Sequence, residues 1–139
     1  MSPIELEAEL NDLRMSKEAQ PLFEAVKRHI AENVDPITEE FFRLGEGRTD
    51  RWSWAPGQLE LLEGAKNKAK AAGLWNFFLP HGDTGTPLSN LDYAYIAAEL
   101  GQSPLASESL NCSAPDTGTK AVTELVGHAG PTDGRPHPL

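Results

Sequence analysis

The sequence is poor in cysteine. Cys112 is the only one among 139 residues, which excludes an internal disulfide framework and leaves no cysteine cluster for structural zinc or an iron–sulfur cluster. This composition suits a reducing compartment. The first stretch, Met1 to Arg14, is acidic. It lacks the basic region and the apolar region of a secretory signal, and it is not Arg-rich as a transit peptide is. We therefore expect a cytoplasmic protein.

Basic residues and long apolar runs are also scarce. Twelve Lys and Arg stand against twenty-one Asp and Glu, giving a formal net charge of −9. A surface of that sign repels phosphate backbones and anionic lipid headgroups, so we expect no nucleic-acid partner. The longest nearly apolar stretch, Gly73 to Pro80, is far shorter than a bilayer-spanning helix, so no membrane span is predicted. The length and the balance of hydrophobic and charged residues predict one soluble globular domain.

No segment alternates with the period of a β-strand, whereas apolar residues recur at three- and four-residue steps. This pattern predicts an all-α bundle of about four to five helices. The first helix is expected over residues 17–44, where Pro36 should kink it or split it in two. The second is expected from Pro56 to a stop at Gly73. The expected inner face of the second helix carries Leu59, Leu62, Ala65, Ala69 and Ala72.

Two further helices are expected after a Gly- and Pro-containing loop. Ser89 and Asp92 have the spacing of a capping box, which predicts a helix from Ser89 to Gly101. Ser103 should cap a fourth helix with Pro104 in its first position. Three regions are thus predicted: a lead-in over 1–15, a helical domain over 16–118, and an irregular Gly- and Pro-rich tail over 119–139.

Few residues suggest chemistry by spacing alone. No pair of the four histidines has neighbouring ligands at metal-binding distance, so all four are predicted to be solvated: His29, His81, His128 and His137. His81 and Asp83 could form a catalytic dyad, although a glycine-rich loop is the simpler explanation. The three lysines of the second helix are predicted to be solvated: Lys66, Lys68 and Lys70. The lone Cys112 is predicted to be a small core residue. Trp75, Phe77 and Phe78 are expected in the core.

The order of several segments closely resembles the N-terminal helical domain of acyl-CoA dehydrogenases. The similar segments are residues 68–80 (KAKAAGLWNFFLP), 88–93 (LSNLDY) and 98–103 (AELGQS). Residues 111–118 (NCSAPDTG) resemble the segment that follows in a branch found in bacteria and, fused to kinase-like domains, in animals. The resemblance covers about residues 16–118, and the sequence departs from the family pattern from Thr119 onward.

The resemblance implies an FAD-dependent oxidoreductase that removes two hydrogens across the α and β carbons of an acyl-CoA thioester. The flavin-binding barrel and the helices with the glutamate base would lie beyond Leu139, so no FAD is expected on this chain alone, and activity is not expected from it. By position, Ser109, Leu110 and Asn111 are expected to line the acyl-chain cavity. A frameshift, a truncated reading frame or a short paralogue would each explain the divergent tail.

A second hypothesis is a helical interaction module that binds a partner chain, a full-length relative or another copy of itself. A domain that normally packs on a barrel keeps a second apolar face, which favours such association. The residues expected on that face are Trp75, Phe77, Phe78, Tyr93 and Tyr95.

Overall fold

The computed structural model describes residues 12–78 and 88–112. His81, His128, His137, the His81–Asp83 pair and the 119–139 tail lie outside the described residues, so the predictions made for them stay predictions. The domain boundaries at 15/16 and 118/119 are likewise untested. Within the described ranges every element of regular secondary structure is helical and no strand is present, which confirms the predicted all-α class.

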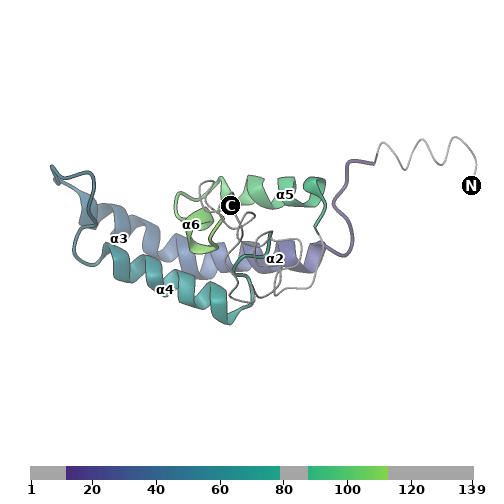
Figure 1. Cartoon of the computed structure of the whole chain (residues 1–139), viewed down its shortest axis with the longest axis horizontal. Helices are drawn as coiled ribbons and strands as arrows, with labels where there is room; N and C mark the ends of the chain where they lie inside the picture. The colour runs from purple at the N-terminus through teal and green to yellow at the C-terminus, as the bar shows by residue number, and fades with distance from the viewer. Residues whose placement is uncertain (1–11, 79–87, 113–139) are drawn as a thin grey trace, which may run out of the picture.

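A long, interrupted helix forms the spine of the molecule (Figure 1). It consists of α2 (Gln20–His29), a π-helical segment η1 (Ile30–Val34) and α3 (Asp35–Gly45). The sequence predicted a break caused by Pro36, and the structure places it one turn earlier. Pro36 has no N–H for the carbonyl four residues before it, and the wider π turn lets the Asp35 N–H donate to the Ile30 carbonyl. Thr38 Oγ1 then donates to the Val34 carbonyl at 2.8 Å.

The second helix, α4 (Gln58–Ala71), returns alongside α3 (Figure 1). It begins two residues after the predicted start at Pro56. The buried Gln58 side chain fixes this junction, since its Nε2 donates to the Phe41 carbonyl and its Oε1 accepts from the Ala55 N–H, both at 2.8 Å. The predicted stop is confirmed: Gly73 has φ +70°, and Leu74 N donates to the Ala69 carbonyl at 2.9 Å, as in a Schellman motif.

The capping box of α5 (Asn90–Leu100) is present as predicted. Ser89 Oγ accepts from the Asp92 N–H at 3.0 Å, and the Asp92 carboxylate accepts from the Ser89 N–H at 3.4 Å. The predicted cap of the fourth helix is wrong. That helix, α6 (Ala106–Ser109), has only four residues, and the Ser103 hydroxyl makes no hydrogen bond within the described part of the chain. The Ser103 carbonyl accepts from the Ala106 N–H instead.

The core lies where α4, α5 and α6 meet the spine. Its buried members are Val26, Ile30, Val34, Phe41, Leu62, Ala69, Leu74, Phe77, Ile96, Leu100, Leu105, Ala106 and Leu110. Of the three aromatic residues predicted in the core, only Phe77 is fully buried, whereas Trp75 and Phe78 are half-buried. Two residues predicted on the inner face of α4, Leu59 and Ala72, are exposed. In the described ranges, no helix is long and apolar enough to cross a membrane.

Candidate functional site

The three residues predicted to line an acyl-chain cavity occupy one turn at the end of α6, here called the Ser109–Asn111 turn. Ser109 and Leu110 are fully buried inside the domain, and Asn111 is half-buried. The helix that carries the turn, α6, packs against α4 and η1. Its role as a cavity lining stays a prediction, and Asn111 is the one of the three whose side chain reaches the surface.

Ser109 is held by a buried histidine from the spine. Ser109 Oγ lies 3.0 Å from His29 Nε2 and donates to the Ala106 carbonyl at 2.7 Å. The opposite nitrogen of the ring, His29 Nδ1, lies 3.1 Å from Asn33 Nδ2. The prediction that His29 is solvated is therefore wrong, since it is only 3% exposed. Its position three residues after Val26 places it on the apolar face of the helix.

Burial lowers the pKa of His29 below its ordinary value of 6.5, and the nearby positive charge of Lys68 lowers it further. The ring is consequently neutral at pH 7. The Ser109 hydroxyl donates its hydrogen bond to the Ala106 carbonyl, so its oxygen accepts a hydrogen bond from His29 Nε2–H. In a nucleophilic dyad the histidine acts as a general base and accepts a hydrogen bond from the serine. Here the histidine donates to the serine, so the pair is not arranged as such a dyad.

Two asparagines in left-handed conformation clasp the turn. Asn76 has φ +59° and Asn111 has φ +62°, a region that non-glycine residues rarely occupy and that asparagine tolerates better than most. Asn111 Nδ2 donates to Asn76 Oδ1 at 2.8 Å, and the Asn76 N–H donates to the Leu110 carbonyl at 3.4 Å. Sequence reasoning missed this clasp. The only local signal was an asparagine directly after an apolar residue, Trp75 in one case and Leu110 in the other.

Charged groups beside the turn are paired. Lys66 Nζ lies 2.8 Å from Glu108 Oε1 and 3.5 Å from Glu63 Oε1. Burial alone would lower the pKa of Lys66, but the two carboxylates outweigh it and raise that pKa. The prediction that Lys66 is solvated is wrong, because its side chain is only 16% exposed. Lys70 lies over the Trp75 ring, with Nζ 4.5 Å from the ring centroid.

Cys112 follows the turn and is half-buried against the core, in agreement with its predicted role as a small core residue. Its Sγ lies 3.7 Å from the Leu110 carbonyl. Burial raises the pKa of the neighbouring Tyr93 hydroxyl, and the charge of a Cys112 thiolate would raise it further. The Tyr93 hydroxyl is therefore protonated at neutral pH.

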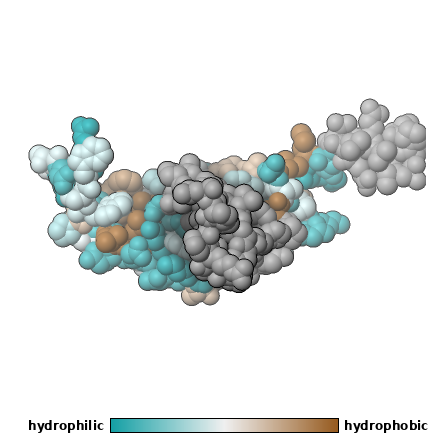
Figure 2. Space-filling model, in the orientation of Figure 1, coloured by the Kyte–Doolittle hydropathy of each residue, from teal (hydrophilic) through white to brown (hydrophobic). Residues whose placement is uncertain are grey.

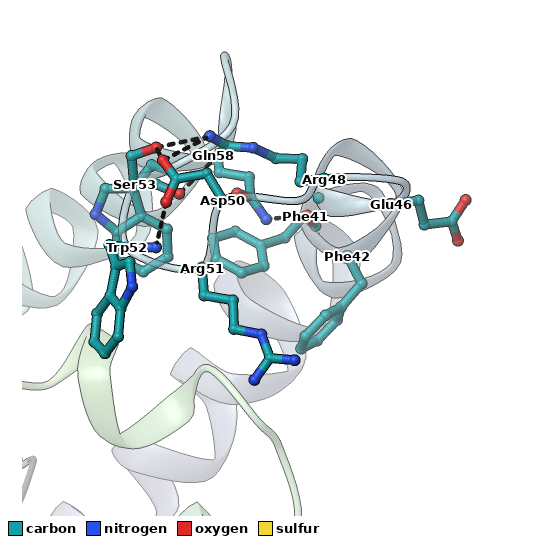
Figure 3. Close-up of a pocket in the computed structure, with 11 residues that line it drawn as sticks. Phe41, Phe42, Glu46, Arg48, Asp50, Arg51, Trp52, Ser53 and Gln58 are labelled. Atoms are coloured by element: carbon teal, nitrogen blue, oxygen red, sulfur yellow. Dashed lines mark hydrogen bonds and ion pairs between the residues drawn. The ribbon is translucent and has the colours of Figure 1, made fainter.

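A second candidate site is a hollow of about 720 Å³ at the α3–α4 end of the molecule (Figure 3). Arg48 is fixed there, since its guanidinium donates to the Ser53 carbonyl at 2.8 Å and to Ser53 Oγ at 2.7 Å. Arg51, Phe42 and Trp52 also line the hollow (Figure 3). Its loop residues lie between the first two predicted helices, where no site was predicted.

Aromatic side chains are unusually exposed at this end. Trp52 is 95% exposed, Trp54 53% and Phe42 49%. In the space-filling view, pale and brown surface lies beside teal there (Figure 2). Of the residues predicted on a second apolar face, Phe77 is fully buried, Trp75, Phe78 and Tyr93 are half-buried, and Tyr95 is 40% exposed. In the described ranges, no three histidine, cysteine or acidic side chains lie close enough to hold a metal ion.

Comparison with known proteins identifies relatives over most of the chain. Acyl-CoA dehydrogenase family member 10 of Mus musculus is 40% identical over 118 residues, which is 81% of this chain and 11% of that protein. Acyl-CoA dehydrogenase family member 11 of Gallus gallus is 41% identical over 115 residues, 81% of this chain and 14% of that protein. The probable acyl-CoA dehydrogenase FadE2 of Mycobacterium tuberculosis is 46% identical over 99 residues, 67% of this chain and 23% of that protein.

No family model matches the sequence. The chain spans between about a tenth and a quarter of the length of the three relatives named above. The matches confirm the resemblance to the acyl-CoA dehydrogenase family. The chain therefore belongs to the acyl-CoA dehydrogenase family and corresponds to a part of its longer members.

Proposed function

We propose that residues 16–118 form the N-terminal helical domain of an FAD-dependent acyl-CoA dehydrogenase, and that the Ser109–Asn111 turn contributes to the wall of its acyl-chain cavity. The observation that carries this proposal is identity of 40–46% to acyl-CoA dehydrogenase family proteins over 67–81% of the chain. The rigid mounting of the turn on η1, α4 and Asn76 supports it, because a cavity wall requires a fixed surface.

The side chains of the turn do not fit a flavin site. Ser109 and Leu110 are fully enclosed, and the Asn111 amide donates to Asn76. We therefore assign the flavin site and the catalytic base to other parts of a longer protein. The contribution of this chain is structural: it would hold one part of the wall of the acyl-chain cavity in place.

We expect the 139-residue protein to remain colourless after incubation with FAD and removal of free cofactor. The measurement is an absorbance spectrum, with a full-length family member treated in parallel as the positive control. A stoichiometric band of bound flavin on the 139-residue protein would contradict the proposal that the flavin site lies in other parts of a longer protein.

We expect a medium-chain acyl-CoA to shift the backbone amide NMR signals of Leu110, Asn111 and Cys112 more than those elsewhere. Coenzyme A alone is the matched control, since it lacks the acyl chain. Shifts confined to the α3–α4 end, or equal shifts with coenzyme A, would contradict the assignment of the turn to the acyl chain.

A second candidate function is an interaction module whose partner is a second copy of this chain. The observation that favours it is the exposure of Trp52, Trp54 and Phe42. Arg48 and Arg51 line the same hollow as these rings. Because the chain has a net charge of −9, a second copy offers acidic surface that attracts these two arginines.

For this candidate we expect the weight-average mass in sedimentation equilibrium to fall to that of the monomer when Trp52→Ser and Trp54→Ser are combined. Leu13→Ser is the matched control, because Leu13 is 71% exposed and lies in the segment before α2. A wild-type protein that is monomeric at all concentrations would exclude this candidate.

A further inference from the structure

We propose that Asn76 is a positioning residue, which fixes the side chain of Asn111 at the surface of the Ser109–Asn111 turn. Asn111 Nδ2 donates to Asn76 Oδ1 at 2.8 Å across 35 positions of sequence, and both residues are half-buried. That an acyl chain meets the Asn111 side chain rests on the proposed function above. The clasp itself consists of described residues of this chain, so it can be tested without any ligand.

The end of α6 explains why residue 111 has a left-handed backbone. The Asn111 N–H donates to the Glu108 carbonyl at 3.2 Å, and the Cys112 N–H donates to the Ser107 carbonyl at 2.8 Å. These are the two hydrogen bonds of a Schellman motif, which needs a left-handed residue where Asn111 stands with φ +62°. Glycine is the usual residue at this position, because it has no Cβ to clash in that conformation.

The end of α4 has the same motif with glycine in this position. Gly73 has φ +70°, and a Cβ added to it would meet no atom within 4 Å. The backbone conformation, and not a lack of space, therefore accounts for the glycine there. The same conformation would favour glycine at position 111. The asparagine bears the steric cost of a Cβ, and a contact that glycine could not make is the hydrogen bond to Asn76.

The core holds both backbones of the clasp in place. Asn76 precedes the fully buried Phe77, and Asn111 follows the fully buried Leu110. The Asn76 N–H also donates to the Leu110 carbonyl at 3.4 Å. Left-handed residues persist where the surrounding structure determines their conformation, as it does at both of these positions. With the two backbones fixed, the amide–amide hydrogen bond restricts the orientation of the Asn111 side chain.

An ordered side chain at the cavity wall has a consequence for affinity. A side chain that is already ordered in the free protein loses little conformational entropy when a ligand contacts it, whereas a mobile one must be ordered on binding. Loss of the clasp should therefore raise the Kd for an acyl chain at the turn by about 2- to 10-fold, the range expected for ordering one side chain.

The first experiment tests the clasp by NMR on the 139-residue protein at pH 7 without ligand. In Asn76→Asp the carboxylate can accept from the Asn111 amide, and in Asn111→Asp the Asn76 amide can turn and donate. In the double variant neither residue can donate, and two negative charges oppose each other. Aspartate resembles asparagine in tolerating a left-handed backbone, so the variants differ chiefly in side-chain pairing.

We expect the backbone amides of Leu110 and Cys112 to stay near their wild-type positions in each single variant. In the double variant their shifts should exceed the sum of the two single changes. In Asn76→Gly, which keeps the left-handed backbone but removes the partner, the Asn111 side-chain amide should exchange with solvent faster than in wild type. Additive shifts in the double variant, or unchanged exchange in Asn76→Gly, would overturn the proposal.

The second experiment measures the Kd for a medium-chain acyl-CoA. We expect a 2- to 10-fold increase in Asn76→Gly and a return to the wild-type value in Asn76→Asp, which restores an acceptor. Asn90→Gly, at an exposed asparagine, is the matched control and should leave the Kd unchanged. Equal Kd values for wild type and Asn76→Gly would overturn the positioning role. Failure of the wild type to bind would instead contradict the proposed function, and the ligand-free spectra would still decide whether Asn76 positions Asn111.

Discussion

Phe77→Ala is expected to lower the free energy of unfolding by about 3–5 kcal/mol, because it removes a fully enclosed aromatic ring and leaves a cavity. The Phe77 ring packs edge-on against Phe78, at 6.1 Å between centroids, and lies 6.3 Å from the Tyr93 ring. It thus joins the segment after α4 to α5. A loss of that size is a large part of the stability of a small domain. Urea denaturation followed by circular dichroism measures it.

Phe78→Ala is the matched control, since it removes the same side chain from a half-buried position next in the sequence. We expect a clearly smaller loss than for Phe77→Ala, because less of the ring leaves water on folding. From the sequence alone, Phe78 was an equally good candidate for the centre of the core. Equal losses for the two variants, or a greater loss for Phe78→Ala, would contradict the burial seen in the structure.

Asp92→Ala is expected to lower the free energy of unfolding by about 2 kcal/mol, since it removes a helix cap and leaves buried donors without their acceptor. The Asp92 carboxylate accepts from the Ser16 N–H at 2.8 Å and from Ser16 Oγ at 2.9 Å, in addition to the Ser89 N–H. It therefore connects the segment before α2 to the start of α5. Chemical denaturation at pH 7 measures the loss, with Asp50→Ala as a control at an exposed carboxylate.

The pH dependence of Asp92 has a defined sign. Burial alone would raise the pKa of this carboxyl, but the hydrogen bonds from Ser16 and Ser89 outweigh burial and lower the pKa below 3.8. The stabilisation is therefore present above pH 3.8 and is lost as the pH falls through the lowered value. Asp92→Asn keeps an acceptor oxygen but no charge. The stability difference between wild type and Asp92→Asn should shrink below pH 3.8, and a difference that grows there would contradict the assignment.

Local signals in the sequence predicted much of the fold. The Ser89–Asp92 capping box, the Gly73 stop and the interruption linked to Pro36 all depend on residues within a few positions of one another. The exact place of the interruption did not follow, because Pro36 acts on the carbonyl four residues earlier. Ser103 does not cap α6 with its side chain as expected. Its carbonyl accepts from the Ala106 N–H instead, in a turn that precedes the helix.

The candidate site was much less predictable, since its contacts join distant parts of the chain. The positions of Ser109, Leu110 and Asn111 followed from the family resemblance, but nothing local indicated that His29 is the partner of Ser109. The prediction that His29 is solvated was wrong because it rested on the polarity of the side chain and not on the three-residue spacing from Val26. Lys66 was misassigned for a similar reason, as its partner Glu108 lies on another helix.

The clasp between Asn76 and Asn111 restricts how this protein can vary in evolution. Each position needs a residue that tolerates a left-handed backbone, and glycine is the principal substitute for asparagine in that conformation. Glycine at one position alone would preserve the backbone there but leave the other asparagine without its amide partner, so the two sites should change together. Among homologues, a joint Asn–Asn or Gly–Gly state at these positions should therefore be more frequent than a mixed pair.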